Sequence, residues 1–213
     1  GDGFDDFLTP NELIFADADG NMIRAKDFQG GFQSVTGIGD INGDGVPDIA
    51  AGLTNLVPYP TGAVLLHMLN RDGDIIESQF IADGVNGGPT LTSTRAKLGA
   101  DVLGIGDLNE DGFNDLIATN TRNNELYVML LDEDHTVKSY VRHYIDSSDF
   151  GNAVTNLGDF DGDGVNDILV GAHQHSENGA RSGAASVVLM NRDGSFKSTT
   201  RITLSELGFP VID

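Results

Sequence analysis

The chain contains no cysteine and no tryptophan, and aromatic residues make up only 7% of its 213 residues. Without cysteine, disulfide bonds cannot stabilise the fold, although this says little about the compartment because bound metal can replace them in secreted proteins. The sequence also lacks any apolar run near the roughly 18 residues that indicate a transmembrane helix, so we expect no direct membrane insertion. The chain opens on Gly1 without a leader-like segment, which predicts a mature product or an excised piece of a longer chain.

Basic residues are scarce as well. Lys and Arg together number 12 against 33 Asp and Glu, which gives a formal charge of −21. A charge of this sign repels phosphate backbones and anionic headgroups, so we expect no nucleic acid partner. Carboxylates at this density need either solvent or cations, and cations become the better explanation where the acids cluster.

Glycine is abundant, with 28 copies, which is typical of many short strands joined by tight turns. The chain also repeats itself. Each copy holds an acidic stretch, followed by two apolar-rich segments around a turn signal that predict a β-hairpin. The acidic segments are 34–53, 101–120 and 153–172, and the hairpin segments are 62–81, 124–145 and 183–202. Helical periodicity is missing throughout.

A fourth copy is split between the two ends of the chain. Residues 1–9 match the second half of the acidic motif, and residues 11–28 match its hairpin. Residues 207–213 resemble the missing first half, with Val211 at a position where the other copies have Asp; chance resemblance of a short tail is the alternative. We therefore predict one repeat domain over 1–213, with a repeat remnant 1–30, repeats 31–97, 98–149 and 150–206, and residues 207–213 as the start of the split copy.

Each repeat is expected to contain a strand, an acidic loop, a second strand, a longer connection and a hairpin of two strands. The four copies divide 213 residues at about 53 each, which suits a four-stranded blade. A β-propeller is favoured over a sandwich because the period is long and uniform. The predicted fold is therefore all-β, with about four blades of four antiparallel strands and an acidic loop between the first and second strands.

The acidic stretches share the pattern Asp-x-(Asp/Asn)-x-Asp-Gly-x-x-Asp. Oxygens at positions 1, 3 and 5 of a tightly wound loop converge on one point, and Gly at position 6 permits the sharp turn. A backbone carbonyl at position 7 joins the shell and the last Asp closes it. The expected ligands are Asp40, Asn42, Asp44, Val46 and Asp48; Asp107, Asn109, Asp111, Phe113 and Asp115; and Asp159, Asp161, Asp163, Val165 and Asp167.

Donors that are all oxygen and mostly charged, on a flexible loop, favour Ca²⁺ over Zn²⁺ or Mg²⁺. We expect three calcium sites and a fourth at the split copy, from Asp213, Asp2, the Phe4 carbonyl and Asp6. The alternative is a set of acidic turns that only face solvent, against which three copies in register argue. Calcium binding to such loops is expected to stabilise the folded chain.

Residues 150–172, which begin with Phe150 and Gly151, and the hairpin that follows at 183–194 resemble the FG-GAP repeats of integrin α-subunit propellers. They are more similar still to FG-GAP and VCBS-type repeats of bacterial surface proteins. The Phe-Gly element departs from the family pattern in the earlier repeats, and seven blades usually close the family's ring whereas this chain has about four.

The resemblance implies an extracellular or cell-surface protein that binds calcium and takes part in adhesion. It places calcium on the face formed by the loops between first and second strands, and ligands on the opposite face. On that face we expect ligand contacts from Tyr59, His173, His175 and Arg181, each of which is otherwise an ordinary loop residue.

Enzyme motifs are missing. No Gly-x-Ser-x-Gly, P-loop or Rossmann pattern occurs, and acids repeated at identical positions do not suit an active site that is built once. His173 and His175 could form half of a transition-metal site, but they have no assigned partner ligand. The expected function is a calcium-stabilised extracellular module without catalytic activity, binding a protein or glycan. The alternative is a structural subunit of an extracellular filament or surface assembly, joined to copies of itself through the split terminal repeat.

Overall fold

The computed structural model of the chain describes residues 6–28, 30–54, 58–144, 153–172, 176–177, 180–181 and 183–203. Every regular element in these residues is a β-strand, and no helix among them is long and apolar enough to cross a membrane. The strands form three antiparallel sheets of four strands, one of three strands and one of two. The predicted all-β architecture of four-stranded antiparallel blades is confirmed.

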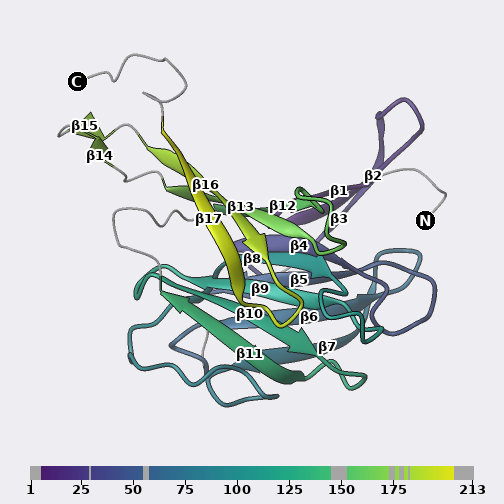
Figure 1. The fold of residues 1–213 in the computed structure, drawn as a ribbon. Coiled ribbons are helices and arrows are strands. Elements are labelled where there is room, and N and C mark those ends of the chain that lie inside the picture. Colours follow the sequence, from purple (N-terminus) through teal and green to yellow (C-terminus); the bar gives the residue numbers. More distant parts are fainter. Residues whose placement is uncertain are drawn as a thin grey trace.

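The sheets follow one another along the chain (Figure 1). The N-terminal sheet contains β1 (Phe7–Leu8), β2 (Glu12–Ala16) and β3 (Met22–Asp27). Blade 1 contains β4 (Ser34–Gly39), β5 (Asp48–Leu53), β6 (Ala63–Leu69) and β7 (Ile75–Ala82). Blade 2 contains β8 (Leu98–Gly106), β9 (Asp115–Asn120), β10 (Glu125–Leu131) and β11 (Val137–Tyr144). Blade 3 contains β12 (Ala153–Gly158), β13 (Asp167–Ala172), β16 (Ala184–Met190) and β17 (Phe196–Thr203), with a small hairpin of β14 (Ser176–Glu177) and β15 (Ala180–Arg181) between its second and third strands.

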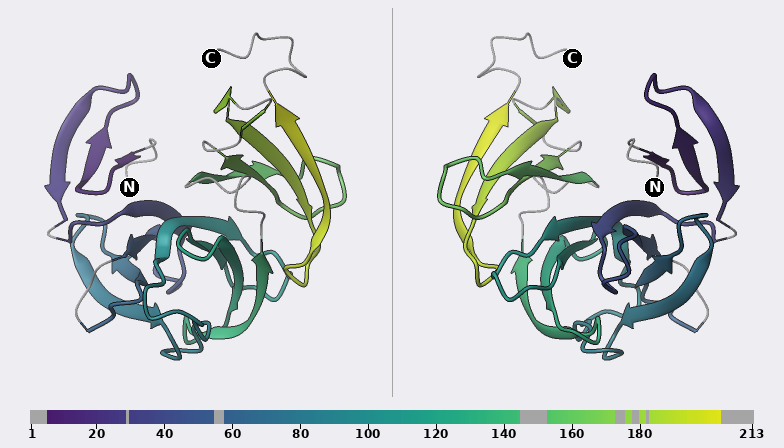
Figure 2. Two further views of the ribbon diagram at one scale, coloured as in Figure 1. Left: turned by 90° about the vertical axis from the view of Figure 1, so that its left-hand side faces the viewer. Right: turned by 90° about the vertical axis from the view of Figure 1, so that its right-hand side faces the viewer.

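Each blade pairs its strands in chain order, from the first strand at one edge to the fourth at the other. The first strands β4, β8 and β12 contact one another in succession, so they line the axis about which the blades are arranged. Figure 2 shows that the described sheets form an open arc, with the N-terminal sheet and blade 3 on either side of the opening. The arrangement is that of propeller blades in a ring that the described residues do not close.

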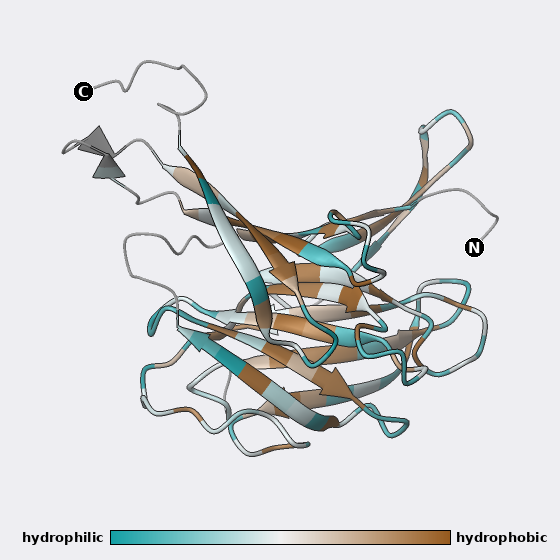
Figure 3. Cartoon of the chain, in the orientation of Figure 1, coloured by the Kyte–Doolittle hydropathy of each residue, from teal (hydrophilic) through white to brown (hydrophobic). Residues whose placement is uncertain are grey.

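The hydrophobic core consists of three layers, each between two successive sheets. Alternate residues of a strand point to opposite faces, so one set packs against the sheet before and the other against the sheet after. Apolar residues are concentrated in the inner strands of the blades, while most loop residues are polar (Figure 3). Leu65 and Leu69 of β6 contribute to the layer shared with the N-terminal sheet, and Val64 and Leu66 to the layer shared with blade 2.

Blades 1 and 2 approach each other closely enough to require glycine. A Cβ atom added to Gly52 would lie 1.9 Å from the carbonyl oxygen of Gly99. Gly99 itself has a φ of 81°, which disfavours any residue with a side chain. Glycine at position 99 is therefore required by the close contact between these two blades.

A single carboxylate joins three blades near the axis. Asp101 of β8 accepts a hydrogen bond from the hydroxyl of Ser34 in β4 on Oδ1, and from the N–H of Val154 in β12 on Oδ2 at 2.7 Å. The N–H of Val102 also donates to the Ser34 hydroxyl oxygen at 3.2 Å. Asp101 is thus a polar link between blades 1, 2 and 3, in addition to their apolar layers.

Candidate metal centres and the opposite face

The three acidic loops occupy equivalent places in the three complete blades. They span residues 40–47, 107–114 and 159–166, and each joins the first strand of its blade to the second. Neighbouring loops lie close together, because the Asn114 side chain donates to the Ile38 carbonyl at 2.8 Å and that of Asn166 to the Ile105 carbonyl at 2.7 Å. The loops therefore lie at one end of the blades.

The first aspartate closes each loop on itself. Asp159 accepts the N–H of Asp163 on Oδ1 and that of Gly164 on Oδ2, both at 2.9 Å. The same two bonds recur from Asp44 and Gly45 to Asp40, and from Asp111 and Gly112 to Asp107. The glycine at position 6 has a φ between 82° and 95° in every loop, which is the conformation that makes the tight turn.

The last aspartate of each loop is buried and holds two strands together. Asp115 is fully buried; it accepts the N–H of Leu108 on Oδ2 and that of Leu131 on Oδ1, both at 2.9 Å. Asp48 and Asp167 make the equivalent pairs of bonds in blades 1 and 3. Sequence spacing indicated these residues only as metal ligands, but they also fix the corner where the loop enters the second strand.

Asp6 shows that the N-terminal sheet has the same corner. Its Oδ1 accepts the N–H of Ala16 at 3.1 Å, in the register that Asp115 and Leu131 occupy in blade 2. The N-terminal sheet is therefore equivalent to the second, third and fourth strands of a blade. The other expected ligands of the fourth site, Asp213, Asp2 and Phe4, lie outside the described residues.

In two of the loops the last aspartate has a raised pKa. Burial raises the pKa of Asp115 to about 6, with a smaller contribution from the charges of Asp111 and Asp107, and two backbone hydrogen bonds act in the opposite direction. Burial also raises the pKa of Asp48. The smaller contribution from Asp111 and Asp107 is a repulsion between carboxylates, which a bound cation would offset.

The donor set of the third loop fits a hard divalent cation. Asp159, Asp161 and Asp167 each offer an oxygen, and these atoms lie within 4.8 Å of one another. Such all-oxygen donors suit calcium, which accepts six to eight oxygens in flexible geometry. The first two loops have Asn at position 3, so they offer one carboxylate fewer each.

Lysines from the fourth strands already bring positive charge to two of the loops. The Nζ of Lys197 lies 2.7 Å from Asp161 and 2.6 Å from Asp163, and its hydrogen bond lowers the pKa of Asp163. Lys138 approaches Asp111 at 3.2 Å from the same register position in blade 2. Blade 1 has Ile76 there, so its loop has no equivalent cation.

Of the four side chains expected on the ligand face, the structure describes only that of Tyr59. Tyr59 is half-buried, and its ring packs against that of Phe80 at 5.2 Å between centroids, so it has a packing role in blade 1. His173 and His175 lie outside the described residues. Arg181 is described only as part of β15, where its backbone pairs with Ser176.

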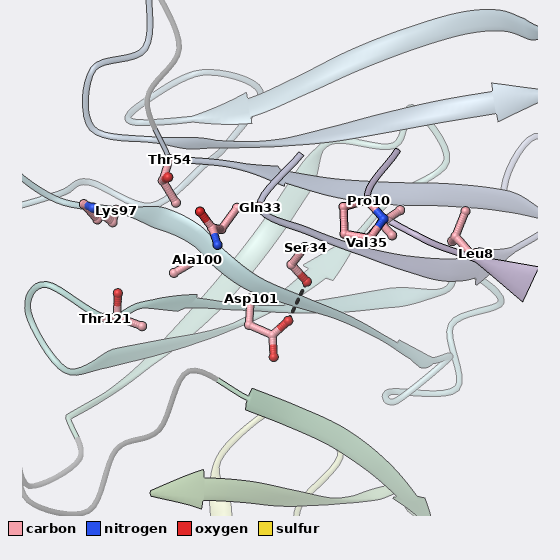
Figure 4. A pocket seen from close by; sticks show the side chains of 10 residues that line it. All are labelled: Leu8, Pro10, Gln33, Ser34, Val35, Thr54, Lys97, Ala100, Asp101 and Thr121. Carbon is pink, nitrogen blue, oxygen red and sulfur yellow. Dashed lines mark hydrogen bonds between the residues drawn. The ribbon is translucent and has the colours of Figure 1, made fainter. Parts of the chain in front are cut away.

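A polar pocket of about 430 Å³ lies at the opposite end of the blades from the acidic loops. It borders the starts of β4 and β8 and the ends of β5 and β9 (Figure 4). Its lining residues are Leu8, Pro10, Gln33, Ser34, Val35, Thr54, Lys97, Ala100, Asp101 and Thr121. No sequence pattern predicted this pocket, because its polar groups come from four separate segments of the chain.

Comparisons with known proteins agree with this repeat architecture. The profile of the FG-GAP-like repeat matches residues 107–170, which run from the second acidic loop to the second strand of blade 3. Integrin alpha-PS5 of Drosophila melanogaster is 27% identical over 147 residues, which cover 62% of this chain. The match spans only 14% of that integrin subunit, so the chain corresponds to a small part of the relative.

Proposed function

We propose that the chain is a calcium-stabilised extracellular binding module without catalytic activity, and its similarity to FG-GAP-like repeats and to an integrin α subunit supports this. The observation that carries the proposal is the recurrence of one oxygen-rich loop in three successive blades, with a convergent carboxylate triad in the third. Calcium would be held by the loop residues named above, where it would neutralise carboxylates that the fold forces together. The loops would therefore have a structural role, and the opposite face would remain free for recognition.

Calcium is expected to raise the melting temperature of the chain. At a calcium concentration 100-fold above Kd, each site contributes about 2.7 kcal/mol to stability. For a chain of this size each kcal/mol raises Tm by about 2–4 °C. Melting would be followed by circular dichroism in excess EGTA, in Mg²⁺ and in Ca²⁺, with binding stoichiometry from calorimetry. An unchanged Tm in calcium, or a stoichiometry below two, would contradict the metal assignment.

Two substitutions at equivalent positions of blades 3 and 1 should change the calcium affinity of their loops in opposite directions. Lys197→Met removes an ammonium group that competes for Asp161 and Asp163, so the third loop should bind calcium several-fold more tightly. Ile76→Lys introduces the competitor in blade 1, where the first loop should bind several-fold more weakly. If both variants bind calcium as the unmodified chain does, the ion does not occupy the loops that these side chains approach.

The partner is proposed to be a protein or a glycan that binds at the end of the blades opposite the acidic loops. The polar side chains of the pocket there are an amide, hydroxyls, one ammonium and one carboxylate, which suit hydrogen bonding to a polar ligand. Arrays of glycans and of extracellular proteins should yield a ligand whose binding is lost in Lys97→Glu and kept in Lys138→Glu, which lies at the calcium end. Equal loss in both variants would move the binding surface away from the pocket.

A second candidate function, a subunit of an extracellular assembly, is favoured by the incomplete N-terminal sheet. Asp6 makes the corner bond of a complete blade, yet among the described residues β1 has no first strand beside it. Residues 207–213, which were expected to supply that strand from the split copy, lie outside the described residues. The exposed side chains of Phe7 and Phe160 on the two end sheets of the arc also favour assembly.

A further inference from the structure

We propose that the outer face of blade 3 docks onto the outer face of the N-terminal sheet of a second copy of this chain, head to tail. Each sheet has a preceding face, turned toward the sheet before it, and a following face, turned toward the sheet after it. Between the N-terminal sheet and blade 3, every following face meets a preceding face in an apolar layer. Among the residues that the structure describes, one face of each kind at the two ends of the arc has no sheet against it (Figure 2).

The following face of blade 3 contains the same apolar positions that are buried in blades 1 and 2. Strand registers make Leu169, Val187 and Leu189 equivalent to core residues of the two earlier blades. Those equivalents are all buried: Ala50, Leu66 and Met68 in blade 1, and Ile117, Val128 and Leu130 in blade 2. In blade 3 the same three positions are only half-buried, although the alternate residues Ile168, Val188 and Met190 are buried.

The second position of the acidic loop gives the same result. Leu108 at this position is 2% exposed and packs in the layer between blades 2 and 3. Ile41 packs likewise against the layer between blades 1 and 2. Phe160, the equivalent in blade 3, is 64% exposed. A phenylalanine at a position that otherwise packs between sheets indicates a surface that another sheet covers.

The preceding face of the N-terminal sheet carries the complementary positions. Phe7 pairs with Ile14 as Ile49 pairs with His67, so Phe7 is equivalent to Ile49, which is buried against the sheet before it. Phe7 is nevertheless 55% exposed.

A second copy of the chain supplies both of the faces that such a contact needs. The missing neighbour of blade 3 would need a preceding face of FG-GAP type, and the N-terminal sheet presents one. The contact would continue the established packing between blades, and it is heterologous, so it generates a ring or a filament. β17 contributes the uncharged residues Ser198 and Thr200 to the blade 3 face, so these two positions add no charge to the proposed contact. Association works against the net charge of −21 and is therefore expected to strengthen with salt.

The test uses the solution mass of the full chain and of two single-face variants. Light scattering between about 1 and 100 μM should give dimers or larger species for the unmodified chain, a range that suits an interface of ordinary strength. Leu189→Asp and Phe7→Asp should each remove one face and, alone, give the 22.5 kDa monomer. Mixed in equal amounts, the two variants retain one intact face each, so they should form a one-to-one dimer and nothing larger.

The outcomes separate this proposal from loss of folding and from the calcium assignment. Because Leu189 and Phe7 are not buried, both variants should keep the circular dichroism spectrum and the cooperative melting of the unmodified chain, whereas Leu130→Asp at the buried equivalent should unfold it. A monomeric unmodified chain at the highest concentration, or a monomeric mixture of the variants, would overturn the proposal. The masses are read in both Ca²⁺ and EGTA, so association without a calcium effect on Tm would support this interface while refuting the metal sites.

Discussion

Asp115→Ala is expected to destabilise the chain by about 2–4 kcal/mol even in excess EGTA. The Asp115 carboxylate is fully buried and accepts the backbone N–H groups of Leu108 and Leu131. Truncation leaves both N–H groups buried without an acceptor, at about 1–3 kcal/mol each, and relief of the buried negative charge offsets part of that loss. Urea unfolding in EGTA would measure the difference.

Asp111→Ala provides the matched control within the same loop. The Asp111 carboxylate is only half-buried, and it accepts hydrogen bonds from the Phe113 backbone N–H and from the side chains of Asn109 and Lys138. Its loss should change stability in EGTA by less than about 1 kcal/mol while removing the calcium-dependent gain at the second loop. If the two variants are equally stable in EGTA, the corner role of Asp115 is refuted and its conserved spacing in the three loops reflects metal alone.

The stability of the metal-free chain should also depend on pH through Asp115. Because the folded pKa of Asp115 is raised to about 6, above the value near 4 in the unfolded chain, the folded state binds the extra proton between these values. Stability from this group is therefore highest below about pH 4 and falls as pH rises toward 6. Asp115→Asn, which cannot titrate, should lack this component when the two unfolding profiles in EGTA are compared.

Asp101→Ala is expected to lower stability by about 2–4 kcal/mol, because it removes the polar link between three blades. The Val154 N–H and the Ser34 hydroxyl would lose their acceptor near the axis. Asp101→Asn keeps one oxygen and should lose less. Urea unfolding measures both, and hydrogen exchange should show the loss of protection concentrated in β12, where the Val154 N–H lies.

Glu77→Ala on the exposed side of β7 is the control for Asp101. It removes the same charge from the chain without removing a contact between blades, so its stability should stay within about 0.5 kcal/mol of the unmodified chain. If Asp101→Ala behaves as Glu77→Ala does, the apolar layers alone hold the blades together and the axial link contributes nothing measurable.

Local physics accounts for what could be predicted from the sequence. Alternation of apolar and polar residues predicts strands, Asp and Gly at fixed offsets predict turns, and repetition predicts that each unit folds alike. The sequence alone therefore predicts the acidic loops between first and second strands and the hairpins after them. The alignment of Asp6 with the last acid of the intact loops also agrees with its bond to Ala16.

The tertiary structure determines why chemically similar residues differ in burial and in contacts. Asp115 is buried and Asp111 is not, although both fit the same motif. The ring of Tyr59 packs against that of Phe80, and Asp101, which lies outside the nine-residue acidic motif, links three blades. Burial and contacts between blades depend on residues far apart in the chain, which a repeat pattern does not encode. The same pattern makes all faces of the sheets apolar, and only their arrangement in an open arc leaves Phe160 and Phe7 exposed at its two ends.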